Sequence, residues 1–376
     1  MRKGEAMTNR TRHIAFFLPA LNSGGAEHSF MTLANFLAAQ GHHIDFLMVK
    51  REGVYLPRLN NNIRLVELGG TGMLRALFPL VGYMQKNRPE WIIAGLPGPN
   101  LMAIVAGYIA RCIMASSPRI AISQHHPFSE KSRHATKLRS RIRHQLARFA
   151  YAGAERVIAV SNGVADDLAA NTILKRAHIS VIHNPVDSDA IREKAAEKPG
   201  HSWLEKRASP VIVSAGRLEA QKDFVTLTQA LAQCNDYRLI ILGEGPDLAM
   251  LKQLAQDNDL GSRIDFTGFV DNPYSYFARA DCFVLSSHYE GFGNVIVEAL
   301  ATGTPVIATD CPYGPREILN NGEYGTLTPP GDAAALAHAI QSCVAQATDT
   351  GKDQRLNRAQ SFDIAAIAER YLSCCD

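Results

Sequence analysis

Short apolar runs alternate with longer helical stretches along almost the whole chain, and this alternation limits the folds open to it. Runs such as 211–215 and 306–309 are short enough to be strands, while stretches such as 26–40 have the length and periodicity of helices. Strands that are apolar along their whole length are typical of parallel sheets covered by helices on both faces. The sequence therefore predicts an α/β fold built from doubly wound, Rossmann-like parallel sheets.

The alternation runs through the first half of the chain and starts again in the second. The strands predicted in the first half are 13–18, 44–49, 63–68, 91–95, 119–123, 156–161 and 179–184. Those predicted in the second half are 211–215, 238–242, 263–267, 282–286 and 306–309. The predicted helices include 26–40, 73–88, 100–115, 133–150 and 224–231.

Chain length also favours two domains, since 376 residues exceed the roughly 100–200 that one domain usually holds. The stretch 191–209 is rich in Glu, Lys and Ala, contains Pro199-Gly200 and contributes no predicted strand. We therefore predict an N-terminal domain over 12–190 and a C-terminal domain over 191–376, with a final helix able to pack back on the first domain. Open α/β sheets bind ligands at the carboxyl ends of their strands, so a cleft between the two domains is expected.

Bulk composition is that of an ordinary globular protein. The net charge of +3 is too small to indicate nucleic acid as a partner, and the seven cysteines show no metal-like spacing, which favours free thiols in a reducing cytosol. Residues 1–11 are polar and basic, which predicts no signal peptide, and the start at Met1 or Met7 stays open. The longest apolar stretch, 101–110, is shorter than the ~20 residues of a spanning helix, so a buried helix is expected there.

Two glutamates near the C-terminal third, Glu290 and Glu298, are separated by seven residues. The first lies in a glycine-bearing turn and the second one turn into a predicted helix that Gly303 would end. The amino end of such a helix favours an anion, and a carboxylate among the apolar residues 295–301 would be costly without a partner. We predict a nucleotide-sugar site in which Glu290 contacts the sugar and Glu298 the ribose. The alternative is a capping Glu290 and a surface Glu298.

Cations follow the first strand of the second half. Arg217 and Lys222 would suit a diphosphate, Arg through forked hydrogen bonds and Lys as a point charge. The alternative is a pair of solvated surface cations. Gly243-Glu244-Gly245 follows the next strand and could contact a nucleobase or form a simple turn. The sequence leaves these two alternatives open.

Ser23-Gly24-Gly25 follows the first strand and opens the first helix, where the glycines would let a phosphate or sugar approach the backbone. A tight turn is the alternative. The motif is not the spaced G-x-G-x-x-G of dinucleotide enzymes. D-x-D patterns at 187–189 and 257–259 are poor metal candidates, because cations and a helix end are already available to neutralise a diphosphate. We expect neither a metal nor a cofactor beside the nucleotide sugar.

A basic stretch with apolar residues at helical spacing covers 131–149. Its apolar residues are Leu138, Ile142, Leu146 and Phe149, and its cations are Lys131, Arg133, Lys137, Arg139, Arg141, Arg143 and Arg148. One interpretation is a surface helix that packs its apolar face on the domain. The other is docking on an anionic membrane, with apolar contact added by 74–81. Nucleic acid is less expected, because no aromatic residues interleave the cations.

Four motifs together resemble the GT4 family of retaining glycosyltransferases with the GT-B fold, and the resemblance covers nearly the whole chain. They are Gly216-Arg217 with Lys222, the segment from Glu290 to Glu298, Gly243-Glu244-Gly245, and His183-Asn184-Pro185-Val186-Asp187. The segment 311–319, Cys-Pro-Tyr-Gly-Pro-Arg-Glu-Ile-Leu, is most similar to the branch with lipopolysaccharide-core and exopolysaccharide enzymes of the WabH type.

The resemblance implies roles by position. Arg217 and Lys222 match the pair that holds the donor diphosphate, Glu290 the glutamate facing the donor sugar, and Glu298 the one on the ribose. His125 matches a histidine near the reacting centre, with His126 as its rival, although Gln124 stands where the family commonly has Glu. The full implied donor site is Gly24, Gly25, Gly216, Arg217, Lys222, Gly243, Glu244, Glu290, Gly291, Phe292, Gly293, Asn294, Val295 and Glu298.

The expected function is therefore retaining sugar transfer, with stabilisation of the leaving diphosphate and no covalent nucleophile. The branch implies a UDP-N-acetylhexosamine as the first candidate donor and GDP-mannose as the second. The expected acceptor is a lipid-linked saccharide or lipopolysaccharide core, which implies a cytoplasmic enzyme peripheral on the inner face of the membrane. Two rivals are a nucleotide-sugar epimerase of GT-B shape and a non-catalytic carbohydrate- or membrane-binding protein. A phosphorylase is disfavoured, because nothing indicates a pyridoxal site.

Overall fold

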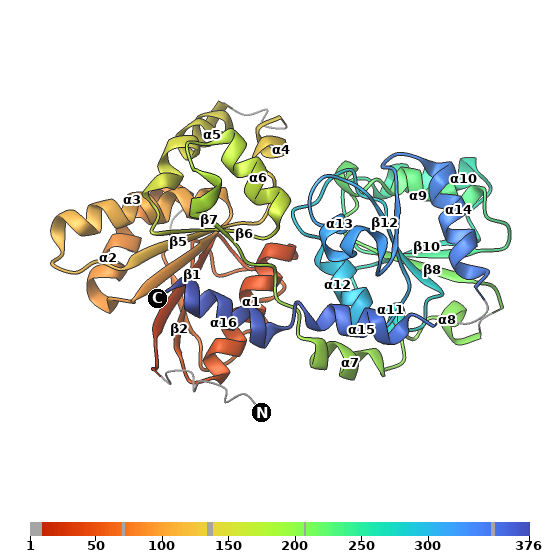
Figure 1. Ribbon diagram of the computed structural model, residues 1–376, viewed down its shortest axis with the longest axis horizontal. Helices are drawn as coiled ribbons and strands as arrows, with labels where there is room; N and C mark the ends of the chain where they lie inside the picture. Colours follow the sequence, from red (N-terminus) through yellow and green to blue (C-terminus); the bar gives the residue numbers. More distant parts are fainter. Residues whose placement is uncertain (1–9, 70–71, 134–137, 207, 347–349) are drawn as a thin grey trace. The chain divides into compact units, whose positions relative to one another are not determined.

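The computed structural model describes residues 10–69, 72–133, 138–206, 208–346 and 350–376. These residues form two compact units (Figure 1). The first unit takes in the chain up to Val160, Val164–Pro185 and Ile367–Asp376. The second takes in Ser161–Gly163 and Val186–Ala366. The main change of unit thus falls between Pro185 and Val186.

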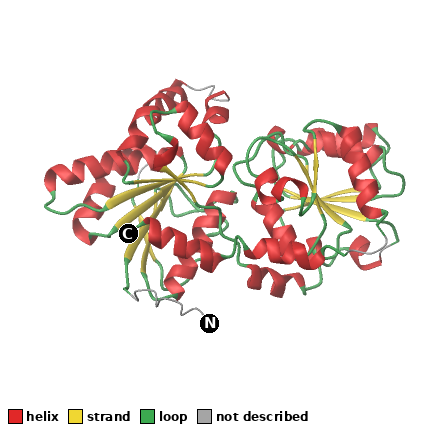
Figure 2. Ribbon diagram, in the orientation of Figure 1, coloured by secondary structure: helices red, strands yellow, loops and turns green. Residues whose placement is uncertain are grey.

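The first unit is built on a seven-stranded parallel sheet with the order β3-β2-β1-β4-β5-β6-β7. Its central strands are buried, as expected for a sheet with helices on both faces (Figure 2). Its strands are β1 (His13–Leu18), β2 (His43–Met48), β3 (Arg64–Glu67), β4 (Trp91–Gly95), β5 (Arg119–Gln124), β6 (Arg156–Ala159) and β7 (Ile179–Val181).

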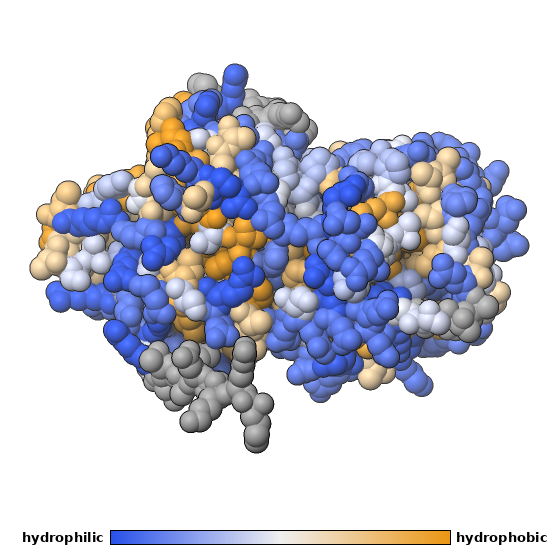
Figure 3. Space-filling model, viewed as in Figure 1, coloured by the Kyte–Doolittle hydropathy of each residue, from blue (hydrophilic) through white to orange (hydrophobic). Residues whose placement is uncertain are grey.

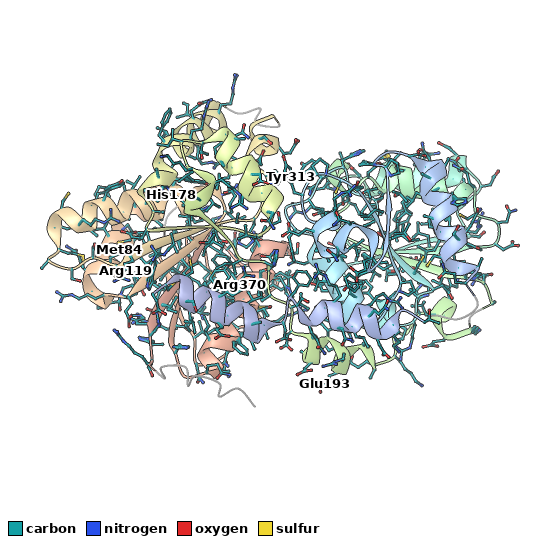
Figure 4. The ribbon with its side chains drawn as sticks, in the orientation of Figure 1. Met84, Arg119, His178, Glu193, Tyr313 and Arg370 are labelled. Atoms are coloured by element: carbon teal, nitrogen blue, oxygen red, sulfur yellow. The ribbon has the colours of Figure 1, made fainter. Side chains whose placement is uncertain are left out.

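Helices cover this sheet. The α-helices are α1 (Gly25–Ala39), α2 (Leu77–Asn87), α3 (Pro97–Ile113), α4 (Phe128–Arg133), α5 (Leu138–Ala150) and α6 (Asn162–Asn171). Short 3₁₀ turns are η1 (Leu56–Arg58), η2 (Met73–Ala76), η3 (Tyr151–Gly153) and η4 (Arg176–His178). The last helix, α16 (Ile364–Cys374), ends against this sheet, where the Arg370 guanidinium donates to the carbonyl of Val181 at 2.6 Å (Figure 4).

The second unit has a six-stranded parallel sheet with the order β10-β9-β8-β11-β12-β13. Its strands are β8 (Val211–Ala215), β9 (Arg238–Leu242), β10 (Ile264–Gly268), β11 (Cys282–Leu285), β12 (Val306–Thr309) and β13 (Thr326–Thr328). Its helices are α7 (Ser188–Ala195), α8 (Ser202–Lys206), α9 (Phe224–Ala232), α10 (Leu248–Asp257), α11 (Tyr274–Phe277), α12 (Asn294–Ala301), α13 (Pro315–Ile318), α14 (Ala333–Val344) and α15 (Lys352–Gln360), with 3₁₀ turns η5 (Ala220–Lys222) and η6 (Asn320–Gly322). Both sheets are doubly wound and parallel, which confirms the predicted fold class.

A buried carboxylate joins three strands of the first unit. The side chain of Asp45 on β2 is fully buried and accepts hydrogen bonds from His13 Nε2 at 2.9 Å, from Arg64 Nε at 2.8 Å and from the Tyr83 hydroxyl. Burial alone would raise the pKa of Asp45, but these donors outweigh it and hold the pKa well below its usual value. The ionised carboxylate is therefore part of the fold.

The same residues include the one group within the described ranges whose atoms could reach a common metal ion: His13, His43 and Asp45. The two imidazole rings are stacked with centroids 4.0 Å apart. The carboxylate already accepts from the Arg64 guanidinium, whose positive charge would oppose a metal cation. We interpret the cluster as a structural ion-pair network.

Replacing Asp45 with Asn should lower the free energy of unfolding by about 2–3 kcal/mol at pH 7, because it removes charged hydrogen bonds in a buried place. Since the folded-state pKa lies below the unfolded value of about 3.9, the deficit should be complete above that pH and disappear as the pH falls towards the folded-state pKa. Urea unfolding at pH 7 and pH 3 measures this. Asp166→Asn, in an exposed pair with Arg176, is the control and should change little. A variant at Asp45 as stable as this control at pH 7 would contradict the assignment.

Candidate active site

Two glycine loops of the second unit interlock at the carboxyl ends of β8 and β9. Gly243 has φ +140°, and a Cβ atom there would lie 2.0 Å from the carbonyl oxygen of Gly216. Leu218 N donates to the carbonyl of Glu244 at 2.9 Å, and a Cβ on Gly245 would meet the backbone of Leu218. The glycines therefore allow two loops to touch through their backbones, a contact that a side chain would prevent. This packing brings the predicted residues Gly216, Gly243 and Glu244 together.

An ion pair links the loops that follow β8 and β11, which are neighbours in the sheet. Lys222 Nζ lies 2.6 Å from Glu290 Oε1, and the two side chains are only 16% and 7% exposed. The aliphatic part of Lys222 lies over Gly216, where a Cβ atom would come within 3.3 Å of it. The predicted cation and the first glutamate are thus in direct contact.

Backbone and amide hydrogen bonds hold these two loops together. Gln221 Nε2 donates to the carbonyl of Tyr289 at 2.9 Å, and His288 N donates to the carbonyl of Gln221 at 2.9 Å. Asp223 follows with a left-handed backbone conformation and caps α9 by accepting from Thr226 N at 3.2 Å. The positions of Lys222 and Glu290 are therefore fixed relative to the sheet and to α9.

Glu298 lies on α12, which begins directly after Gly293 with φ +101° and ends at Ala301. Gly303, with φ +80°, follows its end as predicted. The Glu298 side chain is buried, and burial raises its pKa to about 7. A carboxyl group poised to ionise near neutral pH in a buried place is typical of a functional site.

Arg217 is placed differently from the other three charged residues. Its side chain is half-exposed and lies 3.5 Å from Glu219 Oε2. Among the described residues, the structure records no ion pair between Arg217 and Glu290. Arg217 is thus on the same loop as Lys222 but outside the buried pair.

In the segment between the two glutamates, the Phe292 side chain is buried and its backbone lies close to Gly314. Phe292 is 2% exposed and its ring packs edge-on against Phe362, with centroids 5.5 Å apart. Gly314 approaches so closely that a Cβ atom there would lie 1.9 Å from the Phe292 carbonyl oxygen. Gly291 and Gly293 flank Phe292 and are buried, while Asn294 and Val295 in the first turn of α12 are half-buried.

The remaining predicted site residues lie in the first unit. Gly24 precedes α1, and a Cβ atom there would lie 2.2 Å from Glu27 Oε2, so a carboxylate of the chain itself covers this turn beside Gly25. His125 follows β5 and is 5% exposed, with Nε2 3.0 Å from the hydroxyl of Ser123 and its ring 5.3 Å from that of Phe30.

Residues on either side of His125 shape its turn. Gln124 Nε2 donates to the carbonyl of His126 at 2.7 Å, so Gln124 stabilises the turn with its amide group. The Ser123 hydroxyl is 3.4 Å from that of Tyr371, on the part of α16 that belongs to this unit. His126 is more exposed than His125.

Three of the four aspartates in the D-x-D patterns have structural partners. Asp187 caps α7 by accepting from Ala190 N at 2.9 Å, and Asp189 pairs with Arg192. Asp257 accepts from Gln253 at 2.8 Å, near the end of α10. These contacts are what short polar residues make at helix ends.

The basic stretch turns an apolar face outward. On α5, Ile142, Leu146 and Phe149 are 52%, 55% and 63% exposed, while Ala147 is buried and the His144 ring lies 3.8 Å from that of Phe128. Figure 3 shows apolar residues gathered over α5 and at the outer ends of α2 and α3. The interpretation in which α5 packs its apolar face on the domain is therefore wrong for these residues.

Other exposed apolar side chains lie on η2, α2 and α3, and α3 contacts both α2 and α5. They are Leu74, Phe78, Val105, Tyr108 and Ile113. Arg141 and Arg143 are exposed, whereas Lys137 lies outside the described residues and the structure does not describe the side chains of Arg133 and Arg139. In the part of the chain that is described, no helix has both the length and the apolar character needed to cross a membrane.

Sequence reasoning missed Ser286 and Ser287, whose hydroxyl groups reach the Lys222–Glu290 pair. The available signal was their place directly after the apolar strand 282–285, at the edge of the sheet where ligands bind.

Comparison with known proteins gives two family matches. The family model described as "Glycosyltransferase Family 4" matches residues 23–190, and the one described as "Glycosyl transferases group 1" matches residues 200–360. Together these matches cover most of both units.

Curated relatives match parts of the chain. Over 225 residues it is 29% identical to the N-acetylgalactosamine-N,N'-diacetylbacillosaminyl-diphospho-undecaprenol 4-alpha-N-acetylgalactosaminyltransferase of Campylobacter jejuni, covering 59% of this chain and 60% of that protein. Over 167 residues it is 39% identical to the lipopolysaccharide core biosynthesis glycosyltransferase LpsE of Rhizobium meliloti, covering 44% of this chain and 49% of that protein. The chain thus spans only about half to three fifths of these relatives.

Solved structures match over nearly the whole chain. HepE of Anabaena in complex with UDP has a TM-score of 0.79 at 23% identity, covering 96% of this chain and 98% of that one. The lipopolysaccharide outer core galactosyltransferase WaaB has a TM-score of 0.73 at 18% identity, with coverage of 96% and 98%. At these identities the likeness establishes the fold.

Proposed function

Since this chain belongs to glycosyltransferase family 4 and has the GT-B fold, we propose that it transfers a sugar from a nucleotide-sugar donor to a saccharide in envelope polysaccharide synthesis. One observation carries the proposal: a buried Lys222–Glu290 pair lies at the carboxyl ends of neighbouring strands, in the unit where Glu298 is buried on α12. A cation for phosphates and two carboxylates for hydroxyl groups are the chemistry that a nucleotide sugar requires.

In this proposal Lys222 and the amino end of α12 stabilise the diphosphate as it leaves. Arg217 joins them, because its exposed pair with Glu219 contributes little and can be exchanged for a phosphate. With these charges available, no metal is required to neutralise the leaving group. Attack on the same face of the sugar as the departing diphosphate would give retention, with Glu290 on the donor sugar and His125 near the reacting carbon.

The donor we propose carries uridine. Support comes from the HepE complex with UDP and from the relative named as an N-acetylgalactosaminyltransferase, so a UDP-N-acetylhexosamine is the first candidate and GDP-mannose the second. A thermal-shift screen of UDP- and GDP-sugars separates the two, because a ligand that binds the native state raises the melting temperature.

The acceptor we propose is a lipid-linked saccharide or lipopolysaccharide core, reached from an anionic inner-membrane surface on its cytoplasmic side. The exposed Ile142, Leu146 and Phe149 of α5 would enter the lipid boundary, while Arg141 and Arg143 face acidic headgroups. The relative named as a transferase onto a diphospho-undecaprenol-linked sugar supports an acceptor of this class.

Lys222→Ala should weaken UDP binding at least about tenfold, because it removes a charge-assisted contact and leaves Glu290 facing the phosphates. Transfer should be abolished. Isothermal titration with UDP measures the affinity. Lys252→Ala on α10, an exposed lysine of the same unit, is the matched control and should bind UDP as the wild type does. Equal affinity in the two variants would refute the diphosphate site.

Nucleotide-sugar affinity should rise as the pH increases from 6 to 8, because the pKa of Glu298 is raised to about 7 and its ionised form accepts hydrogen bonds from the two ribose hydroxyl groups more strongly than its protonated form. With one group titrating, we expect up to about a tenfold change over this range. Titrations with the best nucleotide sugar from the screen test this. Glu298→Gln should bind weakly, transfer no sugar and show no such pH dependence. A wild-type affinity that does not change with pH would rule out the assigned contact. The same pH dependence in Glu298→Gln would also rule it out.

The triple substitution of Ile142, Leu146 and Phe149 by Ser should weaken binding to anionic phospholipid vesicles by about tenfold or more. The reason is that three apolar side chains would no longer be transferred from water into the lipid. Co-sedimentation with phosphatidylglycerol-containing vesicles measures this at low and high salt. Met250→Ser on α10, an exposed apolar residue of the second unit, is the control and should leave binding unchanged. Unaltered binding by the triple variant would contradict docking through α5.

A further inference from the structure

Two adjacent serines follow β11 and contact opposite members of the buried ion pair. Ser286 Oγ donates to the backbone carbonyl of Lys222 at 2.8 Å. Ser287 Oγ donates to the carboxylate of Glu290, at 2.7 Å from Oε1. Both serines are buried, at 1% and 0% exposure. The end of one strand therefore contacts the backbone of Lys222 and the carboxylate of Glu290.

The two donors meet at one oxygen of Glu290. Oε1 accepts from Ser287 Oγ and from Lys222 Nζ at 2.6 Å. Within the described ranges, no hydrogen bond reaches Oε2. With the side chain 7% exposed and one oxygen held twice, Oε2 is the atom that can accept from a ligand hydroxyl.

Ser287 itself is fixed to the sheet. Its carbonyl accepts from the hydroxyl of Thr309, the last residue of β12, at 2.6 Å. Its chain neighbour on the other side is Ser286, next to the end of β11. Glu290 lies in a loop, so Ser287 connects it to two central strands, and a ligand contact held by a rigid element is positioned more accurately than one on a loop alone.

In the proposed function, an arriving diphosphate would weaken the Lys222 contact, since its oxygens would compete with Glu290 for the same ammonium group. Ser287 is then the remaining donor that holds Oε1. We propose that Ser287 is a positioning residue that keeps Glu290 directed at the donor sugar while Lys222 binds the diphosphate. This inference rests on the proposed function and assigns a role to a residue outside the implied donor site.

The test compares two ligands: the nucleotide sugar with the largest thermal shift, and the nucleoside diphosphate of the same base. Ser287→Ala should bind the diphosphate within about twofold of the wild type, because Lys222 and Glu298 are intact. It should bind the nucleotide sugar about three- to tenfold more weakly, because the sugar contact of Glu290 is no longer held in place. Ser275→Ala is the matched control: Ser275 is buried and its hydroxyl donates to the carbonyl of Asn272, so it should change neither affinity.

A double-mutant cycle separates positioning from a general loss of structure. In the Glu290→Gln background, Ser287→Ala should cost no further nucleotide-sugar affinity, because the group that it positions has already been altered. Ser287→Thr, which keeps the hydroxyl group, should recover at least part of the loss if its melting temperature matches that of Ser287→Ala or exceeds it.

Three results would overturn the inference. They are an equal loss of affinity for both ligands in Ser287→Ala, full additivity of the two substitutions, or unchanged nucleotide-sugar binding in Ser287→Ala. A wild-type protein that binds no nucleoside diphosphate or nucleotide sugar at all would instead overturn the proposed function, and this inference with it.

Discussion

The Lys222–Glu290 ion pair is the contact on which the candidate site depends, because it joins two loops that leave neighbouring strands of one sheet. Both charges are mostly removed from water, and such a pair is stable only if each member keeps hydrogen bonds that replace solvation. Ser287 supplies one of these bonds, and the interlocked glycine loops bring the Lys222 side chain close to the backbone. The same pair keeps a cation and a carboxylate in place before any ligand arrives, which lowers the cost of ordering them on binding.

Two buried carboxyl groups of this protein, Asp45 and Glu298, have opposite pKa shifts because their surroundings differ. Asp45 is surrounded by donors from His13, Arg64 and Tyr83, and its pKa is held low, so it stays ionised over the whole physiological range. Burial dominates at Glu298, and its pKa is raised to about 7. The lowered pKa of Asp45 accompanies a role in the fold, whereas the raised pKa of Glu298 makes this residue a candidate for ligand contact.

The sequence was sufficient for the fold class, because long apolar strands alternating with helices admit few architectures. It missed β13, since Thr326–Thr328 is short, lies at the sheet edge and has no apolar run. The proximity of Lys222 and Glu290 was accessible, because both follow strands that end at the same edge. The exposed ion pair between Arg217 and Glu219 and the contacts of Ser287 depend on side-chain geometry, which the spacing of residues along the sequence does not reveal. Periodicity likewise defined the apolar stripe of α5 but could not decide whether it faces the domain or the solvent.

The backbone contact between Gly216 and Gly243 has a consequence for engineering new donor preferences. A methyl group on Gly243 would lie 2.0 Å from the neighbouring carbonyl oxygen, so the two loops cannot be redesigned one at a time. A chimera that imports the segment after β9 from another enzyme must import the segment after β8 with it, as a single cassette. The exposed side chain of Glu244 can be varied more easily, because this residue takes part in the loop contact through its backbone carbonyl.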